Sequence, residues 1–328
     1  MPFDHVQDLS ALNTALEGLE MRAGWNKKEP SLWAEPRTAF LPAHWKWRDA
    51  RRGLFLASGM ISTDLADRRN LFMVNPTEGN YYATLRTLVS AYQMIKPGET
   101  ARSHRHSPHA LRLVLETTSG AFTVVNGERL DMATNDVVLT PGDCWHGHGN
   151  DGGEDAYWID FLDVPLVHLL EPMFFEHFPD GFQQPECANQ STEMVFRWSD
   201  IEPQLAARVA AAGAAGTATL VLDAPSMPTT ELSMTGLSAG MRSALARSTD
   251  NQIIAVVAGS GTSTVGDQTF HWERGDVIAI PGWALHRHQA AADSVLFRVS
   301  DSLTQQKLGY YRAVELEPAG PAAPTSAS

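Results

Sequence analysis

A repeated segment constrains the fold of this 328-residue chain more than any other feature. Residues 136–146 read DVVLTPGDCWH and residues 276–286 read DVIAIPGWALH, so aspartate, proline, glycine and histidine recur at the same spacing. Two copies of one segment in register indicate that a single module was duplicated within the chain. Both halves are therefore expected to fold into the same kind of unit.

Both copies are rich in short β-forming runs. The first contains LRLVLE, AFTVV and DVVLTP, and the second contains QIIAVVAG, STVG and DVIAIP, with NG, GD and PG turns nearby. Short strands at regular spacing with such turns are typical of antiparallel sandwiches and small barrels. We therefore predict an all-β-dominated chain with two jelly-roll barrels (double-stranded β-helices) and a helical or irregular N-terminal extension.

The remaining segments are predicted from their composition. Residues 1–80 form an N-terminal extension that packs on the barrels, and residues 81–170 form the first barrel. An Ala-rich run favours a helical linker over 171–222, which precedes the second barrel at 223–315. The Pro-rich, small-residue segment 316–328 is predicted to be a disordered tail.

Charge and composition exclude several classes of partner. Lys and Arg number 25 against 38 Asp and Glu, and the formal charge of −13 disfavours nucleic acids and anionic membranes as partners. No apolar run approaches the ~20 residues of a membrane helix. The N-terminus shows no apolar signal segment, so we expect a cytoplasmic protein. The negative field also repels anions, so an anionic substrate requires arginines that reverse it locally.

A group of histidines in the first copy predicts a metal site. His104 and His106 are two residues apart on a predicted strand and therefore project from the same face. His146 ends a later strand and can supply a third ligand. Such nitrogen ligands suit Fe, Zn, Cu, Ni or Mn, so the ligand type alone does not select the metal. The alternative is a set of histidines hydrogen-bonded on a polar surface.

The second copy lacks most of these ligands. When Ser243 is aligned with Ser103, Ala244 and Ala246 take the places of the two paired histidines, and His286 is retained. One or two histidines do not form a stable site unaided. The second barrel is therefore predicted to be metal-free and structural.

Two further residues of the first copy are expected near the metal. His148 follows His146 by two residues, and it could be a fourth ligand, a proton-transfer group or a buried core histidine. Arg112 shares the parity of the paired histidines, which places its guanidinium on the same side if the strand is unbroken. It could hold a substrate carboxylate, form a buried pair with Asp160, or do both.

The first copy resembles the gentisate 1,2-dioxygenase family of bicupins, which includes salicylate and substituted-salicylate 1,2-dioxygenases. The segments that carry the resemblance are PGETARSHRHSPHALRLVLE, DVVLTPGDCWHGHGN and YWIDFLDVPL. ADRRNLFMVNP and AYQMIKPGE resemble the N-terminal region of that family. VVAGSGTSTVG, GDVIAIPGWALH, VLFRVSD and LGYYR resemble its second cupin. The resemblance covers most of the chain and implies a bicupin fold.

The resemblance implies an enzyme that cleaves aromatic rings with O2. One Fe(II) per chain would be held by His104, His106 and His146 in the first cupin. The ring would open between the carbons that carry the carboxylate and the ortho hydroxyl. A glutamate ligand common in other cupins would fall at Ala110 or Leu111, and its absence matches this family. Members are commonly homotetramers, so we expect a homotetramer.

The resemblance also implies roles for the residues around the metal. His148 would act on protons or on superoxide, and Arg112 and Arg68 would hold the negative charge of the substrate. Gln93 and Asp160 would line or brace the pocket. Because Arg69 is adjacent to Arg68, a one-residue shift of the alignment exchanges these two arginines.

Three positions of the family pattern bear on the substrate. Val89 stands where members often have an aromatic residue, Ala91 occupies a Gly or Ala position, and His109 replaces a residue that is usually uncharged. All three are expected to contribute to substrate binding. The smaller side chain of Val89 frees space, which favours gentisate or another 5-substituted salicylate over salicylate itself.

Two rival functions remain open from the sequence. The first is a Zn- or Mn-dependent cupin isomerase or hydrolase, which would need no O2. The second is a non-catalytic bicupin that binds an aromatic acid without converting it.

Overall fold

The computed structural model describes residues 3–62, 69–190 and 193–322. The chain divides into two compact units, Met1–Arg37 and Thr38–Ser328. The first unit contains helix α1 (Leu9–Glu17). Asp8 caps its N-terminus, because the Asp8 carboxylate accepts a hydrogen bond from the Ala11 N–H at 2.7 Å. The second unit contains both barrels.

The first barrel consists of two facing sheets. Its strands are β2 (Arg69–Phe72), β3 (Val89–Ile95), β4 (Thr100–His106), β5 (Ala110–Glu116), β6 (Ala121–Val125), β7 (Glu128–Asp131), β8 (Val137–Thr140), β9 (His146–Asn150), β10 (Ala156–Leu162), β11 (Phe175–His177), β12 (Cys187–Ala188) and β13 (Val195–Phe196). One sheet has the order β13-β8-β5-β10-β3-β2 and the other has the order β11-β4-β9-β6-β7-β12. Among the described strands of this barrel, only β7 and β12 pair in parallel.

The second barrel repeats this arrangement. Its strands are β1 (Ala43–Trp45), β14 (Thr217–Leu222), β15 (Glu231–Leu237), β16 (Met241–Arg242), β17 (Leu245–Ser248), β18 (Gln252–Ala258), β19 (Ser260–Val265), β20 (Gln268–Glu273), β21 (Val277–Ile280), β22 (His286–Ala290), β23 (Ser294–Ser300), β24 (Ala313–Glu317) and β25 (Gly320–Pro321). One sheet has the order β1-β21-β18-β23-β15-β14. The other follows β20-β19-β22-β16-β25, and β17 pairs with β22 and β24.

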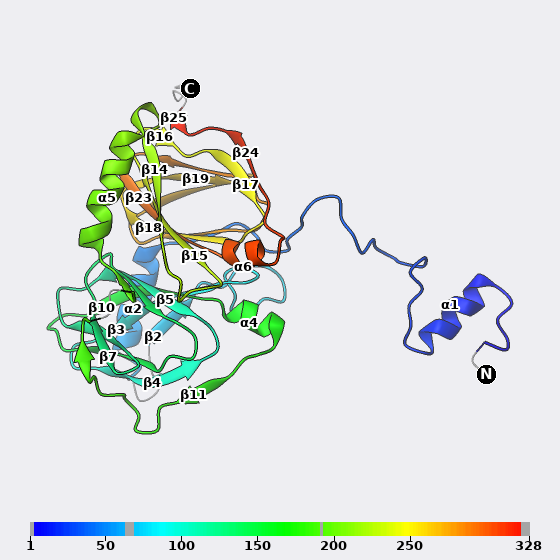
Figure 1. Cartoon of the computed structure of the whole chain (residues 1–328), viewed down its shortest axis with the longest axis horizontal. Coiled ribbons are helices and arrows are strands. Elements are labelled where there is room, and N and C mark those ends of the chain that lie inside the picture. The colour runs from blue at the N-terminus through cyan, green and yellow to red at the C-terminus, as the bar shows by residue number, and fades with distance from the viewer. Residues whose placement is uncertain (1–2, 63–68, 191–192, 323–328) are drawn as a thin grey trace. The chain divides into compact units, whose positions relative to one another are not determined.

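Few helices accompany the barrels. They are α2 (Trp47–Ser58), α4 (Val164–Leu170), α5 (Trp198–Ala211), the short 3₁₀ helix η1 (Gly213–Ala215) and α6 (Ser302–Lys307). Figure 1 shows the two barrels one above the other, with α5 alongside β14 of the second barrel. The predicted two-barrel, β-dominated fold is confirmed. In the part of the chain that the structure describes, no helix is long and apolar enough to cross a membrane.

One hydrophobic core joins the two barrels. Along β5, Leu111 and Leu113 point into this core, whereas Val114 points into the interior of the first barrel. Phe161 of the first barrel meets Phe297 of the second edge to face, with ring centroids 5.6 Å apart. Strands such as β5 are buried on both faces, which explains why LRLVLE is apolar almost throughout.

Residues between Thr38 and β3 contact both barrels. Strand β1 pairs with β21 of the second barrel, whereas β2 pairs with β3 of the first. Trp47 packs its ring against Tyr92 and Tyr157 of the first barrel. The backbone N–H of Trp47 donates a hydrogen bond of 2.8 Å to the Asp276 carboxylate of the second barrel.

The structure differs from the predicted segment boundaries in three places. Strand β14 pairs with β15, so the continuous part of the second barrel begins at residue 217 rather than 223, and β1 adds residues 43–45 to the same sheet. The segment 171–222 contains β11, β12 and β13 as well as α5. Residues 316–317 end strand β24, and 320–321 form β25, so this part of the predicted tail is ordered by pairing with β17 and β16. The last six residues of that tail lie outside the described part of the chain.

Candidate active site

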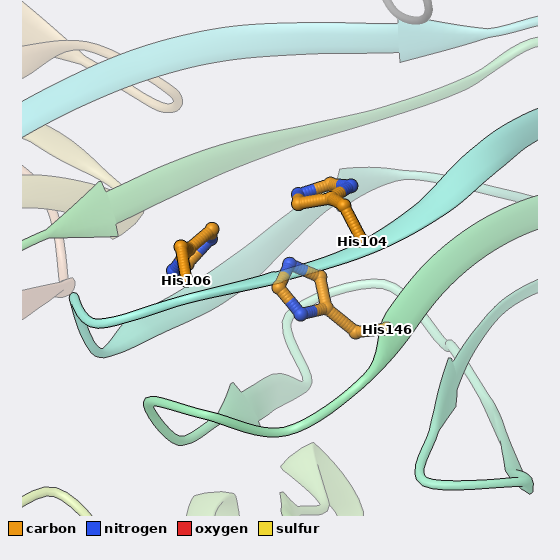
Figure 2. A group of neighbouring side chains, drawn as sticks. All are labelled: His104, His106 and His146. Carbon is orange, nitrogen blue, oxygen red and sulfur yellow. The ribbon is translucent and has the colours of Figure 1, made fainter. Parts of the chain in front are cut away.

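Three histidines converge inside the first barrel. His104 and His106 project from β4, and His146 begins the neighbouring strand β9. One ring nitrogen from each histidine lies within 4.8 Å of those from the other two, and all three residues are buried. Figure 2 shows the three rings turned toward one another.

Backbone carbonyls fix the protonation of all three rings. Each Nδ1 bonds a carbonyl oxygen: His104 with Arg102 at 3.2 Å, His106 with Pro108 at 2.9 Å and His146 with Cys144 at 3.0 Å. Because a carbonyl oxygen only accepts, each Nδ1 carries a hydrogen, and in the neutral ring this leaves the lone pair on Nε2. Carbonyl bonds of this kind orient histidine ligands in metal sites.

The electrostatics of the group also fit a metal ion. His146 Nε2 is buried and has no hydrogen-bond partner among the described residues. Burial, together with the neighbouring His104 and His106, lowers the pKa of His146 well below its ordinary value. Three neutral nitrogen ligands with a lone pair on each suit a divalent transition metal.

The glycine next to His146 lets the two strands approach closely. A Cβ on Gly147 would lie 2.4 Å from Ser103 Oγ and 3.1 Å from the Ala101 carbonyl oxygen. A larger residue would therefore push β9 away from β4. Such a shift would separate His146 from the other two histidines.

Arg112 lies beside the histidines and is fully buried. Its Nε is 3.2 Å from Asp160 Oδ1, and one terminal nitrogen donates to Thr140 Oγ1 at 3.2 Å. The other terminal nitrogen is 3.1 Å from His148 Nε2. Asp160 also accepts a hydrogen bond from Gln93. The expected Arg112–Asp160 pair is therefore present in the structure.

The partners of His148 determine its tautomer. A guanidinium only donates, so His148 Nε2 must accept from Arg112 and the ring is neutral. Its Nδ1–H then donates to Thr123 Oγ1 at 3.1 Å, and the Thr123 hydroxyl donates to Met132 Sδ at 3.6 Å. His148 therefore helps to hold the Arg112 guanidinium in place.

A cavity of about 220 Å³ opens beside these groups. Alternate residues of three adjacent strands form its wall, because residues two apart share a face: Val89, Ala91 and Gln93 of β3, Asp160 and Leu162 of β10, and Ala110 and Arg112 of β5. His106 and His146 approach from the opposite sheet. His106, His146 and Arg112 are buried, and we call them the floor of the cavity.

Comparison with known proteins now identifies the family. Residues 91–164 match the cupin domain family. The chain is 31% identical to 5-aminosalicylate 1,2-dioxygenase of a Comamonas species, over 98% of this chain and 94% of that protein. It is 31% identical to gentisate 1,2-dioxygenase 1 of Aquipseudomonas alcaligenes, over 90% and 93% of the two chains.

The chain belongs to the gentisate 1,2-dioxygenase family. It is an aromatic ring-cleaving dioxygenase of the cupin fold. The crystal structure of salicylate 1,2-dioxygenase from Pseudaminobacter salicylatoxidans superposes with a TM-score of 0.85 at 27% identity, and covers 95% of this chain and 99% of that one. The similarity thus extends over both barrels.

Most of the substrate-binding residues predicted for this dioxygenase lie at the cavity. Val89, Ala91, Gln93 and Asp160 line it together with Arg112. The structure therefore brings together side chains from three strands that are far apart in the sequence.

The other predicted site residues lie elsewhere. His109 and His148 are not among the described residues that line the cavity. His109 Nδ1 accepts a hydrogen bond from the Gly142 N–H at 3.0 Å, so its ring is engaged with the turn before β9. Burial lowers the pKa of His109 below its ordinary value.

The structure describes one of the two adjacent arginines. Arg68 lies outside the described residues. Arg69 is buried on the face of β2 that points away from the cavity, and its terminal nitrogens contact Glu99 at 2.7 Å in a bidentate pair. Arg69 is thus paired with Glu99 and is not among the described residues that line the cavity.

Several residues at the cavity were not predicted, and four of them are Asn70, Phe72, Tyr82 and His168. Asn70 and Phe72 alternate with Arg69 on β2, Tyr82 precedes β3, and His168 belongs to α4. None of them lies in a repeated segment or in a recognisable ligand pattern. The only sequence signal for Asn70 and Phe72 was strand alternation opposite Gln93 and Ala91.

The strand register of the second barrel shows which residues stand in place of the paired histidines. Ala246 pairs with His286 as His104 pairs with His146, so Ala246 replaces His104 and Ser248, two residues on, replaces His106. The alignment that assigned Ala244 and Ala246 to these places was wrong by two residues, because the copies are offset differently at this strand. The described residues of this barrel contain no group of three potential ligands.

Proposed function

We propose that the protein is an Fe(II)-dependent 1,2-dioxygenase of gentisate or another 5-substituted salicylate. It inserts O2 between the carboxylate-bearing and hydroxyl-bearing carbons of the ring. The observation that carries this proposal is a group of three convergent histidines, two of which line a small cavity together with a buried arginine. The relatives named for gentisate and 5-aminosalicylate support the same substrate class.

His104, His106 and His146 would hold the iron through their Nε2 atoms. Bound Fe(II) would pass electron density from the aromatic ring to O2. The three histidines are neutral ligands and leave the cavity side open for the substrate. Ala110 lines the cavity on this side, where other cupins carry a glutamate ligand.

Arg112 would orient the substrate. Its planar guanidinium lines the cavity and matches a carboxylate in geometry and charge. It also provides the local positive charge that an anionic substrate needs in a protein of net charge −13. Asp160 and His148 hold the guanidinium in place, so His148 acts as a positioning residue rather than in direct contact with the substrate.

The size of the cavity favours a single aromatic ring. Ligand clefts usually enclose about 300–1,000 Å³, whereas this cavity has about 220 Å³. A monocyclic hydroxy acid therefore fills the space and excludes water from the floor. Val89 and Ala91 contribute small side chains to the wall, which leaves room for a ring substituent.

Oxygen consumption tests this function. The protein is reconstituted anaerobically with Fe(II) and then mixed with gentisate, salicylate, 5-aminosalicylate or 5-nitrosalicylate in an oxygen electrode. Benzoate, which lacks the ortho hydroxyl, serves as the control substrate. We expect O2 uptake equal to the substrate consumed, with the absorbance of a ring-opened product. Iron-loaded protein that binds these acids without O2 uptake would instead be a non-catalytic binding bicupin.

A further inference from the structure

Two polar side chains meet at the solvent-exposed part of the cavity lining, which we call its mouth. Tyr82 is half-buried and His168 is exposed, whereas the floor residues Arg112 and His146 are at most 1% exposed. Tyr82 Oη lies 2.5 Å from His168 Nδ1, and the two rings meet edge to face at 5.6 Å. The pair therefore forms a defined structure rather than two independent surface residues.

The direction of this hydrogen bond depends on the tautomer of His168. A phenol O–H is a proton donor, and a neutral imidazole nitrogen is a base. Burial raises the pKa of Tyr82 above its ordinary value, which keeps the phenol protonated at neutral pH. When the ring hydrogen of His168 is on Nε2, Tyr82 donates its hydrogen to His168 Nδ1. The lone pairs of Tyr82 Oη remain as acceptors toward the cavity.

The orientation of the substrate rests on the proposed function. A salicylate whose carboxylate and hydroxyl face Arg112 and the three histidines directs the opposite edge of its ring toward the mouth. Ring position 5, para to the hydroxyl, belongs to that edge. A substituent at this position is thus presented to Tyr82 and His168, which line the same small cavity.

We propose that Tyr82, oriented by His168, is a specificity-determining residue that selects substrates with a hydrogen-bond donor at ring position 5. A hydroxyl or amino group can donate to Tyr82 Oη. A nitro group offers only acceptors, and an unsubstituted ring offers nothing to pair with. The Asn70 amide at the same mouth can both donate and accept, so it does not discriminate between these classes.

The test compares two substrates within each variant. Tyr82→Phe removes the acceptor and retains the ring, and Tyr81→Phe is the matched control because Tyr81 is 88% exposed. The readouts are the gentisate-to-salicylate ratio of kcat/KM from O2 uptake and the same ratio of anaerobic Kd by calorimetry. Loss of one neutral hydrogen bond predicts that Tyr82→Phe lowers both ratios about fivefold. Tyr81→Phe should leave both ratios unchanged.

A second variant tests the role of His168. His168→Leu removes the partner of the phenol, so the Tyr82 O–H becomes available to donate to an acceptor on the ring. We therefore expect 5-nitrosalicylate to gain relative to gentisate in this variant. A purely structural role would weaken both substrates together and leave their ratio unchanged.

The outcomes separate this inference from the proposed function. Unchanged ratios in Tyr82→Phe, or equal changes in Tyr81→Phe, overturn the role of Tyr82 even if gentisate is cleaved. If the wild type binds gentisate and consumes no O2, the proposed function fails, and the ratio of Kd values still decides the role of Tyr82. Wild-type protein that binds neither acid contradicts both proposals.

Discussion

Replacement of Asp160 with asparagine would remove the negative charge of a buried ion pair. Arg112 is fully buried, and Asp160 is 2% exposed. The Asp160 carboxylate supplies the negative charge 3.2 Å from Arg112 Nε, and the other contacts described for the guanidinium are with the neutral Thr140 and His148. The asparagine amide retains the shape of the side chain and removes the charge.

The magnitude follows from the burial of the pair. Loss of one partner of a buried ion pair typically costs about 3–5 kcal/mol, because the remaining charge is left in a medium of low polarity. For a unit of this size we expect a fall in Tm of about 6–15 °C. The second barrel carries Ile254 at the position of Arg112. An aliphatic residue is therefore compatible with this strand, and the double variant Arg112→Met/Asp160→Asn should regain more than half of the lost stability.

Scanning calorimetry at neutral pH measures these effects. Asp267→Asn is the matched control, because Asp267 is an exposed aspartate in a turn of the second barrel. The control should have the Tm of the wild type within about 2 °C. A Tm of Asp160→Asn equal to that of the control would refute the reasoning. A double variant less stable than the single variant would also contradict it.

Three further predictions concern the first barrel. Arg112→Lys retains the charge and loses the planar fork, so the Kd for salicylates measured by calorimetry should rise about tenfold or more, with iron content unchanged. Gly142→Ala places a Cβ 2.4 Å from the Ser107 carbonyl oxygen, and we expect a loss of about 1–3 kcal/mol in urea unfolding. The hydrogen bond from Arg69 lowers the pKa of Glu99 below 4.5, so this pair stabilises the fold above pH 4.5 and its contribution is lost as the pH falls through the lowered pKa. Glu99→Gln should therefore be less stable than wild type at pH 7 by about 1–2 kcal/mol, and the difference should shrink in acid.

The two-barrel fold was predictable because the repeated segment and the pattern of short strands both indicate two copies of one β-rich module. The position of Arg112 shows how far such reasoning extends. Its side chain faces the histidines as predicted, but β4 and β5 belong to different sheets rather than to one unbroken strand. The prediction held because the inward faces of both sheets meet in the interior of the barrel.

Tyr82 and His168 could not be predicted, for a physical reason. Tyr82 comes from the connection before β3, and His168 comes from a helix after β10. Neither position has a periodic relation to the histidines, so only the path of the chain in three dimensions brings them together. The same limit explains the two-residue error at Ala246, because strand register depends on loop lengths that a short repeat does not report.

The iron content of two histidine variants tests the central claim most directly. His146 and His286 occupy equivalent places in the two barrels, and each donates through Nδ1 to a carbonyl oxygen two residues earlier. After anaerobic loading with Fe(II) and gel filtration, the account predicts about one iron per chain in the wild type and in His286→Ala, as three ligands in one barrel imply. It predicts almost none in His146→Ala. Iron retained by His146→Ala, or lost from His286→Ala, would contradict the account.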